Sequence, residues 1–165
     1  MDNEQTAITD PLQSRKILDH RGPLFVDVSN AIYFVTIAAK ERSGSAFVAQ
    51  TDAILDSARH YQKLGKWFVY LLLVMPDHLH MLVHVPTVKR LADVIAEWKH
   101  FLSHTAQLTF QRDFFDTRIR DEAHYAEKWK YICMNPVTRG LVATPREWPH
   151  SIAFDRATGA ERPHR

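Results

Sequence analysis

The chain has 165 residues and a mass of 19.1 kDa, a length typical of one compact domain. Hydrophobic residues make up 45% of it, which excludes a wholly disordered chain, and five glycines are too few for a glycine-rich nucleotide-binding loop. There are 21 lysines and arginines against 19 aspartates and glutamates. The resulting net charge of +2 permits a nucleic-acid partner without requiring one.

Several features together predict a protein of the cytoplasm with no membrane partner. The richest apolar run, 67–75, is about half the roughly 18 residues that a membrane span needs. The N-terminal residues are acidic and polar, unlike a secretory signal. Cys133 is the single cysteine, so the chain can form neither an internal disulfide nor a thiolate metal cage, and it fits a reducing compartment.

We predict a single folded domain over residues 20–155. A polar lead-in over 1–19 precedes it, and a flexible tail over 156–165 follows it. No internal repeat, low-complexity tract or linker rich in proline, glycine or serine divides the sequence, so nothing indicates a second domain.

The first predicted elements are a strand and a helix. The segment 31–39, AIYFVTIAA, is apolar on both parities and rich in β-branched and aromatic residues, which is typical of a central strand. A helix follows, in which apolar residues recur at helical spacing. Thr51 or Asp52 can cap its start, and Gly65 can end it.

Two further strands are predicted next to each other in the sequence. The apolar run 67–75 predicts a second buried strand, and Pro76 with Asp77 predicts a turn. The segment that follows, 78–85, alternates strictly between two sets of side chains: Leu79, Met81, Val83 and Val85 on one parity, and His78, His80, Leu82 and His84 on the other. This alternation predicts a strand with one face in the core and the other either carrying chemistry or facing water.

A second helix and a fourth strand complete a recognisable order of elements. Thr87 can cap a helix whose apolar stripe runs from Leu91 to Leu102, and the aromatic-rich segment 110–120 predicts a strand. The order strand, helix, strand, strand, helix, strand predicts an α+β fold. Specifically, it predicts a ferredoxin-like sandwich, an antiparallel sheet with helices on one face.

A last helix is predicted to open at Asp121 and Glu122. Its acidic first turn favours a helix N-terminus, and it runs to about Asn135, because Pro136 prevents simple continuation. This C-terminal helix carries Tyr131.

The histidines of the third strand form the first candidate site. His78 and His80 are two residues apart, so their side chains leave the same face about 6.6 Å apart at the backbone and can converge on one divalent cation. His84 lies about 13 Å further along and should not share that ion without a bulge. The alternative is that these histidines line a solvated sheet face.

The last helix supplies a second candidate group. Tyr125, Trp129 and Ile132 share the stripe expected to pack on the sheet, whereas Tyr131 lies off that stripe. Tyr131 is therefore either an ordinary surface residue or a phenol presented for reaction. Asn135, one turn along, can bring its amide oxygen to the same ion as the histidines, leaving coordination positions open for a phosphate and water.

Four segments together resemble one known family. MPDHLHML at 75–82, FQRDFFDTRIRDE at 110–122, YICMNPVTRGLV at 131–142 and EWPHSIA at 147–153 look like the REP-associated tyrosine transposases, which belong to the single-tyrosine HUH transposases. The likeness covers roughly residues 20–153. It departs from the family pattern at Asp77, where asparagine is usual, and at Arg139, because the basic residue after Asn-Pro-Val is displaced by one position.

The resemblance implies a fold, a cofactor and a reaction. It implies a ferredoxin-like core, a Mg²⁺ or Mn²⁺ ion, and cleavage of single-stranded DNA at REP hairpins through a 5′-phosphotyrosine intermediate. By match, His78 and His80 are metal ligands, Asn135 is the third ligand and Tyr131 is the nucleophile. We expect a monomer or a homodimer, in which Tyr131 completes either its own site or a partner's.

Several basic residues are candidate DNA contacts. Each of six basic side chains is either a phosphate contact or an ordinary surface charge; these are Arg112, Arg118, Arg120, Lys99, Lys128 and Arg139. Lys128 can also favour the phenolate form of Tyr131. Phe114 and Trp148 can stack on bases, although core packing is the favoured role for both.

Three other functions fit parts of the sequence. A histidine-triad nucleotide hydrolase needs a third histidine where Leu82 stands, and a cupin needs more short strands and turn glycines. The alternative that remains is a non-catalytic descendant of the same fold that binds hairpin DNA. The intact set of Tyr131, two histidines and Asn135 favours the enzyme.

Overall fold

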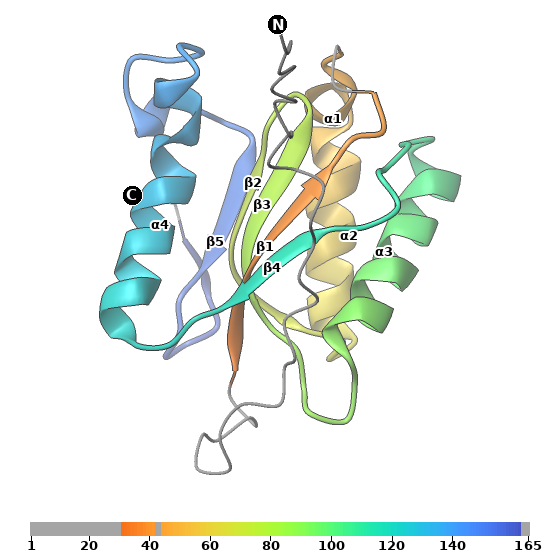
Figure 1. Cartoon of the computed structure of the whole chain (residues 1–165), viewed down its shortest axis with the longest axis vertical. Helices are drawn as coiled ribbons and strands as arrows, with labels where there is room; N and C mark the ends of the chain where they lie inside the picture. The colour runs from red at the N-terminus through yellow and green to blue at the C-terminus, as the bar shows by residue number, and fades with distance from the viewer. Residues whose placement is uncertain (1–30, 42–43, 163–165) are drawn as a thin grey trace, which may run out of the picture.

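A computed structural model describes residues 31–41 and 44–162, and these form one mixed α/β unit (Figure 1). Their single sheet has six strands in the order β4-β1-β3-β2-β5-β6, and every neighbouring pair is antiparallel. The strands are Ile32–Ala38 (β1), Phe68–Val74 (β2), His78–His84 (β3), Phe115–Arg118 (β4), Ser151–Phe154 (β5) and Glu161–Arg162 (β6). The helices are Ala46–Ala49 (α1), Thr51–Lys63 (α2), Leu91–Thr105 (α3), Glu122–Thr138 (α4) and the 3₁₀ turn Pro145–Glu147 (η2).

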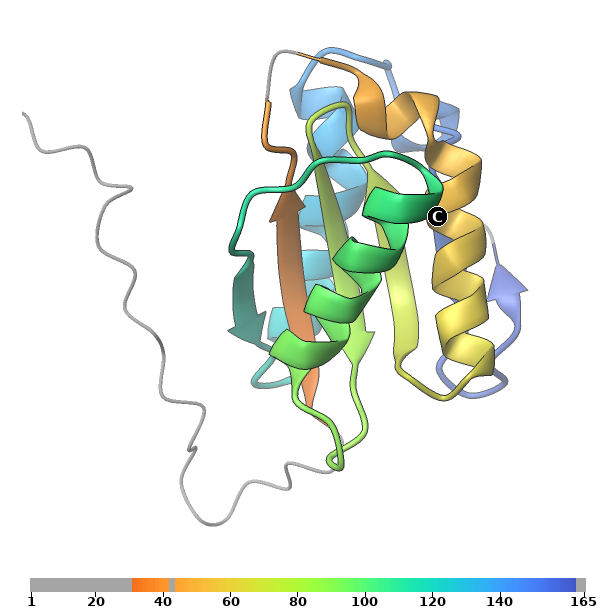
Figure 2. The ribbon, with the colours of Figure 1, turned by 90° about the vertical axis from the view of Figure 1, so that its right-hand side faces the viewer.

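The arrangement confirms the predicted α+β fold. The chain order β1-α2-β2-β3-α3-β4, with the sheet order β4-β1-β3-β2, is that of a ferredoxin-like sandwich. Helices α2 and α3 lie side by side on one face of the sheet, as Figure 2 shows. Helix α4 covers the opposite face (Figure 1), so the described helices occupy both faces rather than one.

The larger core cluster fills the space between the sheet and helices α2 and α3. Strand β3 contributes one parity of its side chains to this cluster, as the alternation predicts, and Leu79, Met81 and Val83 are fully buried there. From α3, Trp98 is also fully buried, and its indole N–H donates to the Ser57 hydroxyl of α2 at 2.8 Å. This bond satisfies a polar group that burial would otherwise leave unpaired.

A smaller core cluster lies between the other face of the sheet and α4. Leu71, Leu73 and Leu82 meet Ile132 of α4 there, and all four are fully buried. Trp148, 7% exposed, closes this cluster, and its indole N–H donates to the Val74 carbonyl at 3.0 Å. On the second parity of β3, Leu82 is therefore covered by α4, whereas His84 at the end of the strand stays partly exposed.

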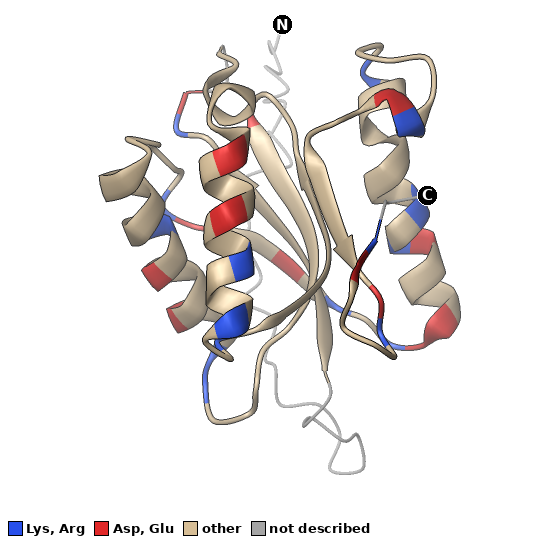
Figure 3. Ribbon diagram, turned by 180° about the vertical axis from the view of Figure 1, so that it is seen from behind, with Lys and Arg blue, Asp and Glu red and all other residues tan. Residues whose placement is uncertain are grey.

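The starts of two helices differ from the predicted caps. Thr51 is the first residue of α2, and its hydroxyl donates backwards to the Val48 carbonyl at 2.8 Å. Arg90, not Thr87, precedes α3, and its side chain forms no capping bond. Along its outward face, α2 carries acidic residues in its first half and basic residues in its second (Figure 3), the order that the helix dipole favours.

The fourth strand is shorter than predicted. Only Phe115–Arg118 of the segment 110–120 forms β4. The ammonium of Lys99 donates to the carbonyls of Gln111 and Arg112 at 2.6 and 2.9 Å, which ties this segment to α3. The start of the segment also bridges the end of β1, where Phe110 pairs with Ala39, before the chain reaches β4.

The last helix is longer than predicted. Asp121 caps α4, as expected, by accepting the backbone N–H of His124 at 2.7 Å. The helix then runs past Pro136 to Thr138. Proline removes one backbone donor but has a helical φ, and the backbone N–H of Arg139 still reaches the Asn135 carbonyl at 3.0 Å. The loss of the one backbone hydrogen bond that Pro136 cannot donate therefore does not end the helix.

The C-terminal residues also correct a prediction, because residues 156–162 are not a frayed tail. The Asp155 carboxylate accepts the backbone N–H groups of Ala157 and Thr158, forming a turn from which β6 pairs with β5. Glu161 of β6 accepts both Nε and Nη2 of Arg59 at 2.9 Å. The predicted lead-in over 1–19 lies outside the described residues. Among the helices of the described residues, none is long and apolar enough to cross a bilayer.

Replacing Tyr125 by phenylalanine should leave the free energy of unfolding unchanged or raise it by up to about 1 kcal/mol. The Tyr125 hydroxyl is buried and has no hydrogen-bond partner within the described residues, so the wild type loses its hydration without compensation. Burial also raises the pKa of Tyr125 to about 12. Urea unfolding measures the change, and a loss above about 1 kcal/mol would mean that the hydroxyl has a stabilising partner.

Candidate active site

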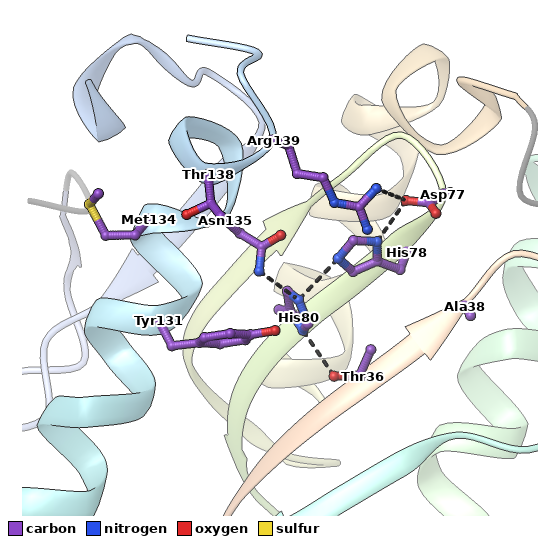
Figure 4. A pocket seen from close by; sticks show the side chains of 10 residues that line it. All are labelled: Thr36, Ala38, Asp77, His78, His80, Tyr131, Met134, Asn135, Thr138 and Arg139. Carbon is purple, nitrogen blue, oxygen red and sulfur yellow. Dashed lines mark hydrogen bonds and ion pairs between the residues drawn. The ribbon is translucent and has the colours of Figure 1, made fainter. Parts of the chain in front are cut away.

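A pocket of about 380 Å³ lies between α4 and the adjoining ends of β1 and β3 (Figure 4). It contains the residues that the sequence singles out for chemistry, drawn from elements far apart in the chain. Its lining residues are Thr36, Ala38, Asp77, His78, His80, Tyr131, Met134, Asn135, Thr138 and Arg139. Because all of them belong to one chain, Tyr131 and the histidines meet within a single protomer.

The two histidines point their Nε2 atoms at each other. His78 and His80 are 7% and 3% exposed, and their Nε2 atoms are 3.0 Å apart. Asp77 binds His78 Nδ1 through Oδ1 at 2.7 Å, and the Thr36 hydroxyl lies 2.9 Å from His80 Nδ1. When each ring carries its proton on Nδ1 and donates it in a hydrogen bond to one of these oxygens, both Nε2 atoms are unprotonated and their lone pairs face the pocket.

Helix α4 brings a third polar group to the same point. The side-chain Nδ2 of Asn135 lies 3.1 Å from His80 Nε2, and Asn135 is 9% exposed. Rotating the side-chain amide of Asn135 by half a turn about its Cβ–Cγ bond exchanges Nδ2 with Oδ1. The same position can therefore offer an oxygen ligand. Two imidazole nitrogens and one side-chain amide thus converge at one point of the pocket.

The electrostatics favour a neutral His80 near an ionised carboxylate. Burial, with the nearby His78 and Arg139, lowers the pKa of His80 to about 3. Burial alone would raise the pKa of Asp77, but its hydrogen bond to His78 and the charges of His78 and Arg139 hold that pKa below its ordinary value. The pair is therefore ready to bind a cation without first losing a proton from His80.

These residues fit a divalent metal ion. Within the described part of the chain, no group of three or more His, Cys, Asp or Glu side chains could hold a metal, so a third protein ligand has to come from another residue type. Asn135 is such a residue. Three ligands whose imidazoles are each oriented through Nδ1 match an open metal site with a supporting outer shell.

Tyr131 lies beside this group with half of its side chain in solvent. It is 51% exposed, its ring centroid is 5.4 Å from that of His80, and its hydroxyl points toward His80 (Figure 4). The Lys128 ammonium lies 6.0 Å from the centre of the same ring. In contrast, Cys133 faces the core, where burial raises its thiol pKa to about 11. Of these two nucleophiles on α4, only the phenol reaches the pocket.

Arg139, one of the candidate DNA contacts, lies at the mouth of the pocket. Its guanidinium is 3.8 Å from Asp77 Oδ1, and its side chain is 53% exposed. At that distance and exposure the ion pair is weak, so the cation remains available to an incoming anion.

Lys128 lies beside Tyr131, but the other four predicted DNA contacts, Lys99, Arg112, Arg118 and Arg120, are not brought to the pocket. The ammonium of Lys99 is bonded to the backbone near Arg112, and the backbone N–H of Arg120 donates to His124 Nδ1. Arg118 pairs with Tyr33 across the sheet, on the face that packs toward α3. His84, as expected, takes no part in the histidine pair, and its Nδ1 bonds to the Ala31 carbonyl.

Several residues in the pocket or packed against its histidines were not predicted from the sequence. Thr36 positions His80, and the feature of the sequence that could have revealed it is the one aliphatic hydroxyl within the apolar run 31–39. Phe34 stacks on His80 with ring centroids 5.4 Å apart, but nothing distinguishes it from an ordinary core residue in the sequence. Met134 and Thr138 line the pocket because they share the helix face of Tyr131.

Comparison with known proteins supports the resemblance predicted from the four motifs. The chain is 27% identical over 150 residues to a protein from Haemophilus influenzae named "Putative REP-associated tyrosine transposase", covering 79% of this chain and 83% of that protein. No protein-family model matches the chain.

A solved structure confirms the fold. The structure of a REP-associated tyrosine transposase bound to a REP hairpin superposes with a TM-score of 0.68 at 22% identity, covering 73% of this chain and 75% of that one. A crystal structure of a putative transposase from Deinococcus radiodurans aligns more loosely, with a TM-score of 0.48 at 18% identity, covering 68% of this chain and 94% of that one.

The buried His80 should make the metal-free protein less stable in mild acid. The unfolded chain binds a proton at this histidine near pH 6.5, whereas the folded chain binds it only near pH 3. The free energy of unfolding should therefore fall as the pH drops below about 6.5, by about 1 kcal/mol per unit from this group.

Urea unfolding between about pH 6.5 and pH 4.5, in the presence of a chelator, measures this slope. The variant His80→Gln cannot take up the proton at this position and should show a shallower slope than the wild type. Equal slopes for the wild type and His80→Gln would contradict the assignment.

Proposed function

We propose that the chain is a REP-associated tyrosine transposase of the single-tyrosine HUH type. It would be a metal-dependent endonuclease and strand transferase that acts on single-stranded DNA at REP-type hairpins. One observation carries the proposal: an exposed phenol, Tyr131, lies beside a buried, pre-oriented pair of imidazoles in the same pocket. The likeness to proteins named for that activity, one of them bound to a REP hairpin, supports it.

The proposed reaction begins with attack by the Tyr131 oxygen on a backbone phosphorus. The new oxygen–phosphorus bond replaces the bond to the 3′ oxygen, which leaves as a 3′-hydroxyl, and the DNA remains attached through a 5′-phosphotyrosine. Attack by a 3′-hydroxyl on that linkage reverses the exchange and rejoins strands. No ATP is needed, because each step breaks one phosphodiester as it forms another.

His78 and His80, through Nε2, and Asn135, through its amide oxygen, would hold a Mg²⁺ or Mn²⁺ ion. When bound, that ion supplies Lewis-acid polarisation of a phosphate oxygen. The chain's own contribution is to keep the ligands in place: Asp77 and Thr36 fix the two rings, and burial keeps His80 neutral.

Two cations flank the phenol and suit a negatively charged substrate. Lys128 lies one turn before Tyr131, and its ammonium is close to the phenol ring, where it favours negative charge on the attacking oxygen. Arg139 lies two turns after Tyr131, at the pocket mouth. A phosphate that enters the pocket exchanges the weak contact of Arg139 with Asp77 for a charge-assisted hydrogen bond.

The alternative is a non-catalytic hairpin-binding protein with the same fold. It needs neither an exposed phenol nor oriented imidazoles, so the geometry favours the enzyme. The two functions differ in one observable, the covalent adduct.

Replacing Tyr131 by phenylalanine should abolish the covalent protein–DNA adduct, because the attacking oxygen is removed. The adduct is measured with labelled single-stranded hairpin oligonucleotides and Mn²⁺ on a denaturing gel. DNA binding should change by no more than about twofold, since one exposed hydroxyl is lost. Tyr125→Phe, the same substitution at a buried position of α4, is the control and should retain the adduct. An adduct with Tyr131→Phe would refute the nucleophile, and none with the wild type would favour the binding protein.

Replacing Asp77 by alanine should weaken Mn²⁺ binding about 10- to 100-fold, because His78 loses the partner that orients its ring. Asp77→Asn should lose less, since an amide oxygen still accepts the Nδ1 proton. Isothermal titration with Mn²⁺ measures both affinities. Asp56→Ala, at an exposed carboxylate of α2, is the control. Wild-type affinity in Asp77→Ala would contradict this role.

A further inference from the structure

Phe115 exposes an aromatic ring on the same face of the sheet as the active-site pocket. Thr36 of β1 pairs with His80 on one side and with Phe115 of β4 on the other, so the three residues form one cross-strand row. Side chains in such a row leave the same face, and Phe115 is two strand spacings, about 10 Å, from His80. Strand β4 is the edge of the described sheet, and Phe115 is 55% exposed.

The Phe115 ring belongs to an aromatic cluster centred on Phe34. Phe34 meets Phe115 edge-to-face with centroids 6.4 Å apart and meets Tyr131 likewise at 5.8 Å. Phe34 itself is 6% exposed, whereas its two neighbours are more than half exposed. Phe115 therefore contributes little to the core for its size, and its ring remains free to contact a ligand beside the nucleophile.

A positive charge lies over the same cluster. The Lys128 ammonium is 5.7 Å from the Phe34 ring centre and 6.0 Å from that of Tyr131. It also bonds to Glu127 at 2.9 Å, but Glu127 is 67% exposed, and such surface pairs yield readily to another anion. Cations that contact the backbone, with aromatic rings that contact bases, are the combination found in sites for single-stranded nucleic acids.

We propose that Phe115 is a stacking platform for an unpaired base of the DNA strand whose phosphate is presented to Tyr131. The inference rests on the proposed function and specifies its substrate: the nucleotide next to the scissile phosphate is single-stranded, because a base inside a duplex has no free face to offer. The platform would contact the flat face of a base by stacking. It would not select a particular sequence, since every base has such a face. Phe114 and Trp148, the aromatics that the sequence suggested, pack in the core instead.

The test is a fluorescence-anisotropy titration of labelled oligo(dT) of about 15 nucleotides at fixed salt. Phe115→Ala should weaken binding about 5- to 100-fold, Phe115→Leu should weaken it similarly because a leucine cannot stack, and Phe115→Trp should restore it. An abasic oligonucleotide of the same length should bind Phe115→Ala as it binds the wild type. The slope of affinity against salt should not change, because no phosphate contact is lost.

The matched control is Leu64→Ala, which removes a side chain of equal exposure, 55%, from the far side of the fold. It should bind oligo(dT) as the wild type does. Unchanged affinity in Phe115→Ala would overturn the proposal, and so would an equal loss for the abasic strand. If a second copy or residues 1–30 covered Phe115 instead, Phe115→Ala would alter the oligomeric state or proteolysis of the N-terminal segment and leave oligo(dT) affinity unchanged.

The outcome is distinguishable from failure of the proposed function. A wild-type protein that forms the covalent adduct, while Phe115→Ala keeps full affinity for oligo(dT), would overturn the stacking platform alone. A wild-type protein that binds oligo(dT) through Phe115 but forms no adduct would instead overturn the catalytic proposal and leave the platform standing.

Discussion

The docking of α4 on the sheet is the constraint on which the pocket depends, because its chemical groups come from two separate elements. The attachment is apolar: Ile132 is fully buried against Leu71 and Leu82. Apolar contacts are not directional, so they do not determine how far α4 is shifted along the sheet. The hydrogen-bond contact between Asn135 and His80, at 3.1 Å, fixes the position of the helix. Since Tyr131 lies one turn away on the same helix face, that contact also places the phenol.

A second constraint concerns protons. Asp77 forms a hydrogen bond with Nδ1 of His78, and Thr36 forms one with Nδ1 of His80. These bonds orient the rings so that their Nε2 atoms face each other at 3.0 Å. Two lone pairs at that separation repel unless something positive lies between them or beside them. A shared proton is disfavoured, because burial lowers the pKa of His80 to about 3. Under the proposed function, a divalent cation held by both Nε2 atoms would relieve the same repulsion.

The parts of the site that depend on local periodicity were predictable from the sequence. The strand period of two put His78 and His80 on one face, and the helix period put Tyr131 and Asn135 on another. The positions of the basic side chains were harder to predict, because they depend on the bounds and register of β4. Since β4 starts only at Phe115, Arg118 falls on the face away from the pocket and Arg112 falls outside the strand. The exposed aromatic proved to be Phe115 and not its neighbour Phe114, a difference of one residue that reverses the face.

The same reasoning explains why the acidic residue at 77 and the arginine at 139 belong together. Asp77 is 13% exposed and accepts from His78, so it stays ionised in a pocket that, under the proposed function, must admit phosphate. An uncompensated carboxylate there would repel the substrate. Arg139 offsets that charge from α4, close enough to screen Asp77 and, at 3.8 Å and half exposed, loosely enough to turn toward an entering phosphate. The pair leaves the pocket neutral at rest, and any cation held by the histidines then makes it attractive to DNA.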